Sequence, residues 1–253
     1  MILDDALIDR VHRIGVATLR DTGEGYSRVL SATKGAEMGT GYALFAGEGS
    51  PLTQVYGFGH RSPGDVDALD PFFEGLAENW EVTVTPFTSQ ETLAALSERG
   101  YRPSHFEGTL AQITTAVASP DVDIVEVEED DPEWMEATWR GWSGVESGDA
   151  QIDDLVRAVA TMKSRKYLAR IDGVPAATAS LFEYGDGVAL GGAATRVPFR
   201  GRGLQSALLA RRLHDAGPGR LAIMGAMPGT TSHRNAQRAG FTPLYSTMVW
   251  MRR

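Results

Sequence analysis

The stretch with the most chemical content is Arg200-Gly201-Arg202-Gly203, which joins an apolar, strand-like segment at 188–194 to a helical segment beginning at Leu204. A glycine turn that opens a helix leaves several backbone N–H groups unpaired and pointing outward. The helix N-terminus adds partial positive charge, so such a turn favours anions, and phosphate above all. The sequence therefore predicts a phosphate site here. The alternative is a plain solvated turn, because short glycine motifs are common.

A second segment lies downstream of this turn. Residues 231–239 have the pattern of a helix, and Gly240 can adopt the left-handed conformation that ends one. A predicted strand at 221–227 separates the two helices. The order from residue 193 to residue 241 is therefore turn, helix, strand, helix and a Gly-Phe exit.

These two segments together resemble the acyl-coenzyme A signature of the GNAT superfamily of N-acyltransferases, Arg/Gln-x-x-Gly-x-Gly/Ala. Arg200 and Gly203 match its first and fourth positions, whereas Gln205 departs from the small residue at the sixth. The resemblance implies that Asn235, on the second helix, contacts the pantetheine arm. The coenzyme-binding residues that it implies are Thr195, Arg196, Val197, Arg200, Gly201, Arg202, Gly203, Leu204, Gln205, Ser206 and Asn235.

The resemblance also implies an activity, the transfer of an acetyl group from acetyl-CoA to a primary amine by direct attack in a ternary complex, without a metal. In the family, two parted strands hold the pantetheine, and a backbone N–H stabilises the oxyanion. Here these are the strand ending at Val197 and the strand from Leu221. The sequence does not identify the amine. The alternatives are a noncatalytic acyl-CoA sensor and an interaction protein.

The acid and base are harder to place. The family often has a tyrosine four residues before the glycine that ends the second helix, and Ala236 stands there. Neither predicted central strand, 188–194 or 221–227, carries a carboxylate. Tyr245 is our first choice for the acid that protonates the thiolate, because it follows the Gly-Phe exit. The full set of candidates is Tyr245, Glu183, His233 and Tyr184, for which the alternatives are structural roles at a hairpin end, in the core or at a helix start.

Composition narrows the class of protein. The chain has 253 residues, which suggests about two domains. It contains no cysteine, which excludes disulfides and thiolate metal sites. The first residues lack the pattern of a signal peptide, and no apolar run reaches membrane-spanning length, so we expect a cytoplasmic protein without a membrane partner.

Charge is distributed unevenly along the chain. The net charge of −9 argues against a nucleic-acid partner. From Arg196 onward there are ten arginines and one acid, a charge of +9, so the preceding residues carry −18. This pattern fits a small polyphosphate bound locally. Four of these arginines, Arg211, Arg212, Arg252 and Arg253, are expected to be solvated.

The two halves of the chain have similar patterns. Tyr42–Gly49 parallels Tyr167–Gly173, and Arg99–Pro103 parallels Ala239–Pro243. We therefore expect an α+β fold with a mixed α/β sheet, made of two GNAT-like domains in tandem. Residues 1–118 would form a degenerate scaffold domain and residues 119–253 the catalytic domain, in a monomer or homodimer. Two unrelated α/β halves are the alternative.

Hydrophobic periodicity predicts the individual elements. Helices are expected at 3–21, 62–79, 90–99, 132–143, 152–162, 204–216 and 231–239, and strands at 41–46, 53–59, 81–85, 105–114, 123–128, 167–171, 176–183, 188–194, 221–227 and 245–251. Trp134, Trp139 and Trp142 cluster in one helix, where Met135, Trp139 and Trp142 suggest a core stripe and the family suggests an acceptor-site wall.

Two features of the first half complete these expectations. Its counterpart of the arginine-glycine turn carries Asp65, Asp67 and Asp70, whose charges would repel a diphosphate. The chain after Gly100 and after Gly240 is too short for a final hairpin. An uncovered sheet edge is a liability, so each half is expected to cover the other.

Overall fold

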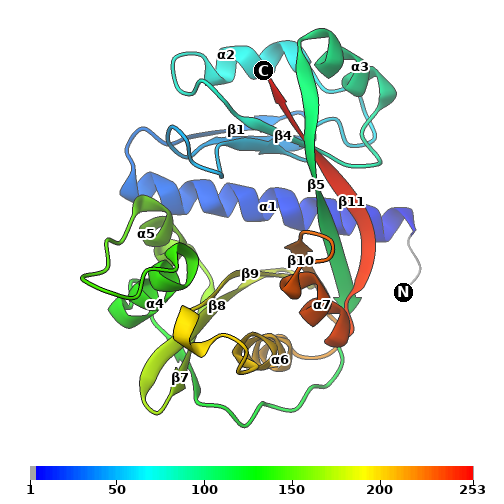
Figure 1. The fold of residues 1–253 in the computed structure, drawn as a ribbon. Helices are drawn as coiled ribbons and strands as arrows, with labels where there is room; N and C mark the ends of the chain where they lie inside the picture. The colour runs from blue at the N-terminus through cyan, green and yellow to red at the C-terminus, as the bar shows by residue number, and fades with distance from the viewer. Residues whose placement is uncertain (1–3, 253) are drawn as a thin grey trace.

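The computed structural model describes residues 4–252, which form one mixed sheet of eleven strands with helices on both faces (Figure 1). The first half contains α1 (Asp5–Val29), β1 (Lys34–Met38), β2 (Gly41–Phe45), β3 (Gln54–Tyr56), a 3₁₀ turn (Val66–Ala68), α2 (Leu69–Phe73), β4 (Glu81–Val84), α3 (Gln90–Glu98) and β5 (Tyr101–Ile113). The second half contains β6 (Ile124–Val127), α4 (Pro132–Ser143), α5 (Asp154–Thr161), β7 (Arg165–Ile171), β8 (Val174–Tyr184), β9 (Gly187–Thr195), a 3₁₀ turn (Val197–Phe199), α6 (Leu204–Ala216), β10 (Leu221–Ala226), α7 (Thr231–Arg238) and β11 (Thr242–Arg252).

The last strands of the two halves exchange places. The sheet order is β1-β2-β3-β4-β11-β5-β10-β9-β8-β7-β6. Thus β5 of the first half pairs with β10, and β11 of the second half pairs with β4. The two exchanged strands also pair with each other over ten positions, and Figure 1 shows them side by side. The expectation that each half covers the other's short end is confirmed.

Alternation along the strands divides the core into two layers. On one face, apolar residues such as Leu181 and Ala222 pack under α6 and α7. On the other face, Phe182 and Ile223 pack under α1, α4 and α5. In the first half, α2 and α3 cover a cluster around Phe73 and Val82. The sheet is therefore buried on both sides.

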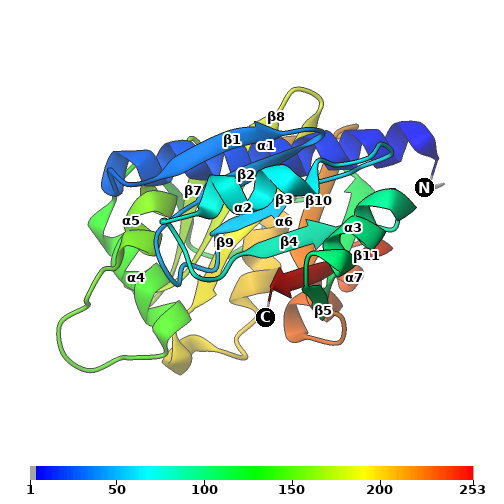
Figure 2. The ribbon, with the colours of Figure 1, turned by 90° about the horizontal axis from the view of Figure 1, so that it is seen from above.

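Helix α1 connects the two halves. Near its start, Leu7 and Val11 pack in the cluster that contains Ile223, and further along Leu19 and Tyr26 pack against Leu44. Figure 2 shows α1 running the width of the molecule, with α5 beside its C-terminal part. Each fully buried side chain of this size contributes about 1.5–3 kcal/mol to the stability of the fold. Because α1 buries such side chains in both halves, it stabilises the two cores together.

Three sequence expectations about the elements are wrong. Helix α1 continues to Val29, because Gly25 lets it approach α5 so closely that a Cβ there would lie 2.7 Å from the Ala158 oxygen. The helix expected at 62–79 is a 3₁₀ turn and a five-residue helix, ended at Gly75 with φ of 70°. Strand β1 was not expected, because its sequence lacks apolar alternation.

The arginines expected to be solvated are paired or buried. Arg211 bonds Asp215 at 2.9 Å, Arg252 bonds Asp70 at 2.5 Å, and Arg212 is only 3 % exposed. Arg253 lies outside the described residues. None of the helices within residues 4–252 combines the length and apolar character needed to cross a bilayer. In the same range, no three His, Asp or Glu side chains are grouped as metal ligands.

Candidate functional site

The turn before α6 has the geometry of an anion site. Gly203 precedes the helix with φ of 77°, and no side chain caps the first amides. Gly201 has φ of 78°, a left-handed conformation that costs other residues about 1–2 kcal/mol. A Cβ on either glycine would meet nothing within 4 Å. Glycine is therefore required here for backbone conformation, and the space in front of the amides is open.

Two side chains fix this turn against the end of β9. Arg200 donates to the carbonyl oxygens of Thr195 at 3.2 Å and Gly141 at 3.0 Å. Gln205 donates from Nε2 to the Ala194 carbonyl and to the Thr195 hydroxyl, each at 2.8 Å. The residue that departs from the GNAT signature therefore has a structural role, because it ties α6 to the strand.

Other predicted coenzyme residues have partners within the protein. Glu146 accepts from the Arg196 guanidinium at 2.7 Å and from the Val197 N–H at 3.0 Å. The Leu204 side chain lies in the core, so only its backbone faces the turn. Arg202 is exposed and lies over the Phe199 ring at 5.6 Å.

Of the remaining two coenzyme residues, Ser206 is exposed in the first turn of α6. Asn235 on α7 is partly buried and accepts from Arg238 at 3.1 Å.

Beside the turn, β9 and β10 part from each other. Their parallel pairing covers only Gly187–Ala189 against Leu221–Ile223, although β9 continues to Thr195. A bulge in β9 follows, since the register with β8 shifts there and Gly192 has φ of 61°. Beyond Ala189, the edges of β9 and β10 that face each other are unpaired. Such a split can accept an extended ligand arm.

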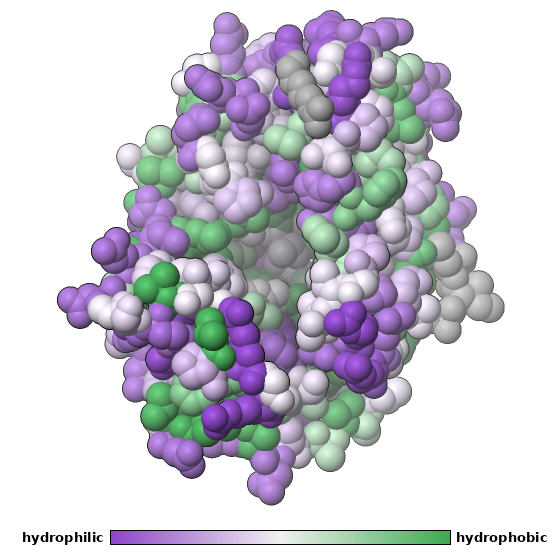
Figure 3. Space-filling model, viewed as in Figure 1, coloured by the Kyte–Doolittle hydropathy of each residue, from purple (hydrophilic) through white to green (hydrophobic). Residues whose placement is uncertain are grey.

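A cavity of about 500 Å³ lies where the split meets the first half. Figure 3 shows a hollow at the centre of the molecule, between its upper and lower parts. Both halves supply its walls. The lining residues are Gly15, Thr18, Leu19, Thr22, Pro51, Leu52, Gln54, Tyr56, Glu81, Thr83, Glu107, Gly108, Thr109, Phe182, Ala189, Leu190, Gly191, Ile223, Met224, Gly225 and Thr247.

The predicted acid and base candidates are not among these lining residues. Tyr245 pairs in the sheet with Thr109, which does line the cavity. Its ring packs edge-on against Phe87 at 5.4 Å, and burial raises its pKa well above the usual range. His233 lies in the first turn of α7, where its N–H donates to the Thr230 hydroxyl.

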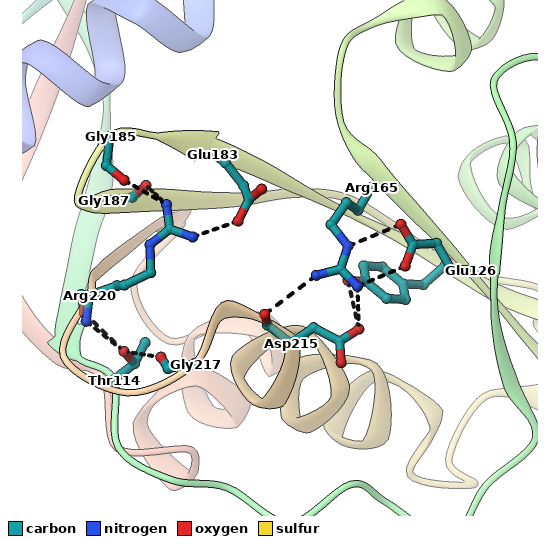
Figure 4. Close-up of polar contacts among 10 residues, drawn as sticks. Thr114, Glu126, Arg165, Glu183, Gly185, Gly187, Asp215, Gly217 and Arg220 are labelled. Atoms are coloured by element: carbon teal, nitrogen blue, oxygen red, sulfur yellow. Dashed lines mark hydrogen bonds and ion pairs between the residues drawn. The ribbon is translucent and has the colours of Figure 1, made fainter.

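Glu183 is held in a structural ion pair. Arg220 bonds its carboxylate at 2.5 Å and donates to the carbonyl oxygens of Gly185 and Gly187, as Figure 4 shows. This network ties the β8–β9 turn to the start of β10, so it closes the end of the split opposite the glycine turn. Tyr184 is half-buried, and burial raises its pKa above the usual range. It lines a separate cavity of about 190 Å³.

The carboxylates of Glu81 and Glu107 line the cavity from β4 and β5 and were not among the residues expected from the sequence. All the expected acid and base candidates belong to the second half. The strand exchange brings first-half residues to the site. The similar short ends after Gly100 and Gly240 are the sequence signal that could have led to them.

The expectation that Met135, Trp139 and Trp142 form the core-facing stripe of α4 is wrong. Trp134 is fully buried together with Ala137 and Gly141, whereas Trp142 is 39 % exposed and bonds the Ala193 carbonyl at 3.1 Å. None of the three tryptophans lines the cavity.

The corresponding segment of the first half carries carboxylates. The carboxylate of Asp65 accepts from the Asp67 amide at 3.1 Å and so caps the short 3₁₀ turn. Asp67 and Asp70 are engaged by Arg99 and Arg252. Three carboxylates are therefore gathered at this helix start, and two of them are paired with arginines.

Comparison of the whole chain with solved structures identifies the fold. A GCN5-related N-acetyltransferase from Kribbella flavida aligns over 94 % of this chain and 95 % of its own, with a TM-score of 0.65 and 18 % identity. A tandem GNAT protein from the clavulanic acid biosynthesis pathway aligns over 91 % and 86 %, with a TM-score of 0.59 and 15 % identity. The chain has the GNAT fold in tandem.

This tandem GNAT fold confirms the α+β class and the resemblance found in the sequence. No protein-family model matches the chain, and no curated protein matches it. At 15–18 % identity, the two structural relatives establish the fold and leave the chemistry to the site.

Proposed function

We propose that the chain is an N-acetyltransferase that moves an acetyl group from acetyl-CoA to a primary amine by direct attack in a ternary complex. One observation carries the proposal: the uncapped start of α6 adjoins the split between β9 and β10, and the split leads to a cavity. A diphosphate, an extended arm and an acceptor amine need these three features in this order.

We assign coenzyme binding to the second half. The amides of Leu204, Gln205 and Ser206, with Arg202, would hold the diphosphate, and Asn235 would contact the pantetheine. Thr195, Arg200 and Gly201 would shape the turn. Arg196 and Val197 stay predictions, although Glu146 already uses their donors. We keep residues 1–118 and 119–253 as the proposed domains, and a cytoplasmic location as a prediction.

A noncatalytic acyl-CoA sensor is the second candidate. Ala236 stands where the family often has its tyrosine, and the central strands of the second half carry no carboxylate. Release of free thiol from acetyl-CoA with a panel of amines separates the two candidates. A sensor would bind the coenzyme without amine-dependent thiol release.

The Gly203→Glu substitution tests the coenzyme site itself. The protein leaves room for the side chain, but the left-handed backbone of Gly203 strains any other residue, so a control with the same backbone conformation is needed. At about 5 Å, each charge pair costs about 1–3 kcal/mol for effective dielectric constants between 80 and 20. Two diphosphate charges therefore weaken coenzyme A binding at least thirtyfold, or about 2 kcal/mol.

Gly203→Asn is the matched control, because asparagine tolerates the left-handed conformation without adding charge. Calorimetry should give one coenzyme A site per chain, with less than about fivefold weakening in Gly203→Asn. Two equivalent sites per chain, or unchanged binding in Gly203→Glu, would contradict the assignment.

A further inference from the structure

The cavity joins the proposed acetyl site to the first half. Leu190 and Gly191 of β9 and Met224 and Gly225 of β10 line it where those two strands part. From there it extends under α1 to β3, β4, β5 and β11. A molecule in this cavity would contact both halves at once.

The cavity is anionic and uncompensated. Its lining includes Glu81 and Glu107 but no lysine, arginine or histidine. Neither carboxylate forms an ion pair with any residue between 4 and 252. The pKa of Glu81 is raised, mainly by burial. The nearby His105 acts in the opposite direction, and the negative charge of Glu107 adds to the increase. Burial and the charge of Glu107 raise the pKa of Tyr56 to about 12.

Two threonines add hydroxyls to the same wall. Thr83 is 2 % exposed and Thr247 is 3 % exposed, and both line the cavity. No hydrogen bond within residues 4–252 engages either hydroxyl, and neither oxygen is fully enclosed by protein atoms. Both hydroxyls are therefore available to a polar group in the cavity.

Apolar side chains also line the cavity, among them Leu19, Leu52, Phe182 and Ile223. The two carboxylates lie on β4 and β5, whereas β8 contributes Phe182. The hydroxyls of Thr18 and Thr22 on α1 already bond to carbonyl oxygens of their own helix. The complementary ligand is therefore a cation with an apolar chain.

The two carboxylates lie at different distances from the split. β5, which carries Glu107, is the immediate neighbour of β10, whereas β4, which carries Glu81, lies two strands further from it. At about 4.8 Å per strand, β4 and β5 are about 10 Å apart. Glu107 is therefore nearer to the split, and Glu81 is placed for a second, more distant positive charge.

Building on the proposed acetyl transfer, we propose that this cavity binds the acceptor, and that the acceptor is an aliphatic amine with a second positive charge, of the diamine or polyamine class. Glu81 binds the distant ammonium group, and Glu107 receives the reacting one. A monoamine would leave one carboxylate without a counter-charge.

Glu107 also accounts for the proton that must leave the ammonium group. Its carboxylate takes this proton, and the freed nitrogen forms a C–N bond to the acetyl carbon as the C–S bond breaks. A second proton moves from the nitrogen to the sulfur, which leaves as the free thiol. Glu107 is exposed at the cavity mouth and returns its proton to water. The products are an N-acetyl amine, a thiol and one released proton.

Direct binding to the full chain tests this inference without the coenzyme. In calorimetry, α,ω-diamines from 1,3-diaminopropane to 1,8-diaminooctane should bind at least tenfold more tightly than n-alkylamines of the same length. Glu81→Gln should reduce the best diamine to the level of its monoamine. Glu98→Gln, an exposed glutamate of α3 outside the cavity, should leave this preference unchanged. Equal binding of diamines and monoamines, or no diamine binding, overturns the inference whatever coenzyme A does.

Turnover provides the second readout. With acetyl-CoA, Glu107→Gln should lower kcat about 10²- to 10⁴-fold, the usual range for general-base catalysis. Its coenzyme A affinity and cooperative thermal unfolding should match those of the unmodified chain. Glu81→Gln should lower kcat/KM for diamines and leave monoamine turnover intact. Coenzyme binding and turnover without a diamine preference would overturn this inference and leave the proposed acetyl transfer standing.

Discussion

The strand exchange predicts that neither half folds without the other. Residues 119–253 expressed alone would retain β10 and β11 but lose β4 and β5. In the intact chain, β5 lies between β10 and β11, so its removal deprives both of their neighbour. The exposed chain around Ala118 and Ser119 is the natural place to divide the protein.

The loss can be estimated from the register. Six residue pairs join β10 to β5, and six backbone hydrogen bonds at about 1 kcal/mol each give about 6 kcal/mol. Leu110, fully buried, adds about 2 kcal/mol. This sum is comparable with the whole stability of a typical domain, about 5–15 kcal/mol. The isolated fragment should therefore be aggregated, partly unfolded or dimeric through a new strand exchange.

Sedimentation and urea unfolding of the fragment provide the assay, with co-expressed 1–118 and 119–253 as the control. The co-expressed halves should assemble into a one-to-one complex that unfolds cooperatively, because both exchanged strands are then present. A monomeric 119–253 fragment with a cooperative transition would refute the reasoning.

Two further predictions concern single side chains. Tyr245→Phe should lower kcat about ten- to a thousandfold and change the alkaline limb of its pH profile. An unchanged rate and limb would remove Tyr245 as the acid. We expect no single substitution among Glu183, Tyr184, His233 and Tyr245 to abolish turnover, and a complete loss in one of these variants would contradict that expectation. Burial and the neighbouring His60 lower the pKa of His12 from 6.5 to about 4. Below pH 6.5, His12 binds a proton in the unfolded chain but stays neutral in the folded chain. The free energy of unfolding should therefore fall by up to about 3 kcal/mol by pH 4. Denaturant titrations should show a weaker acid dependence in His12→Gln, and an equal dependence would contradict this assignment.

Local signals in the sequence were strong enough to determine most elements of the second half. The glycine turn, the apolar strand before it and the Gly240 exit are short-range features, since backbone conformation and periodicity need no distant partner. The open start of α6 confirms the predicted turn geometry. The first half was less predictable, because α1 packs around its own glycines and the 62–79 segment has charges and prolines without a continuous apolar stripe.

What the sequence determined by itself was the order of most elements, the resemblance to a GNAT fold and the glycine turn before α6. The tertiary structure decided which side chains face that site, because strand pairing is set by contacts between distant segments. Glu81 and Glu107 precede the glycine turn by about a hundred residues and reach the cavity only because β5 and β11 exchange places. The tertiary structure also decided the place of Arg212 in the core. Its guanidinium donates to the carbonyl oxygens of Ser180 at 3.1 Å and Gly191 at 3.3 Å, beside the β9 bulge, and these partners come from distant strands.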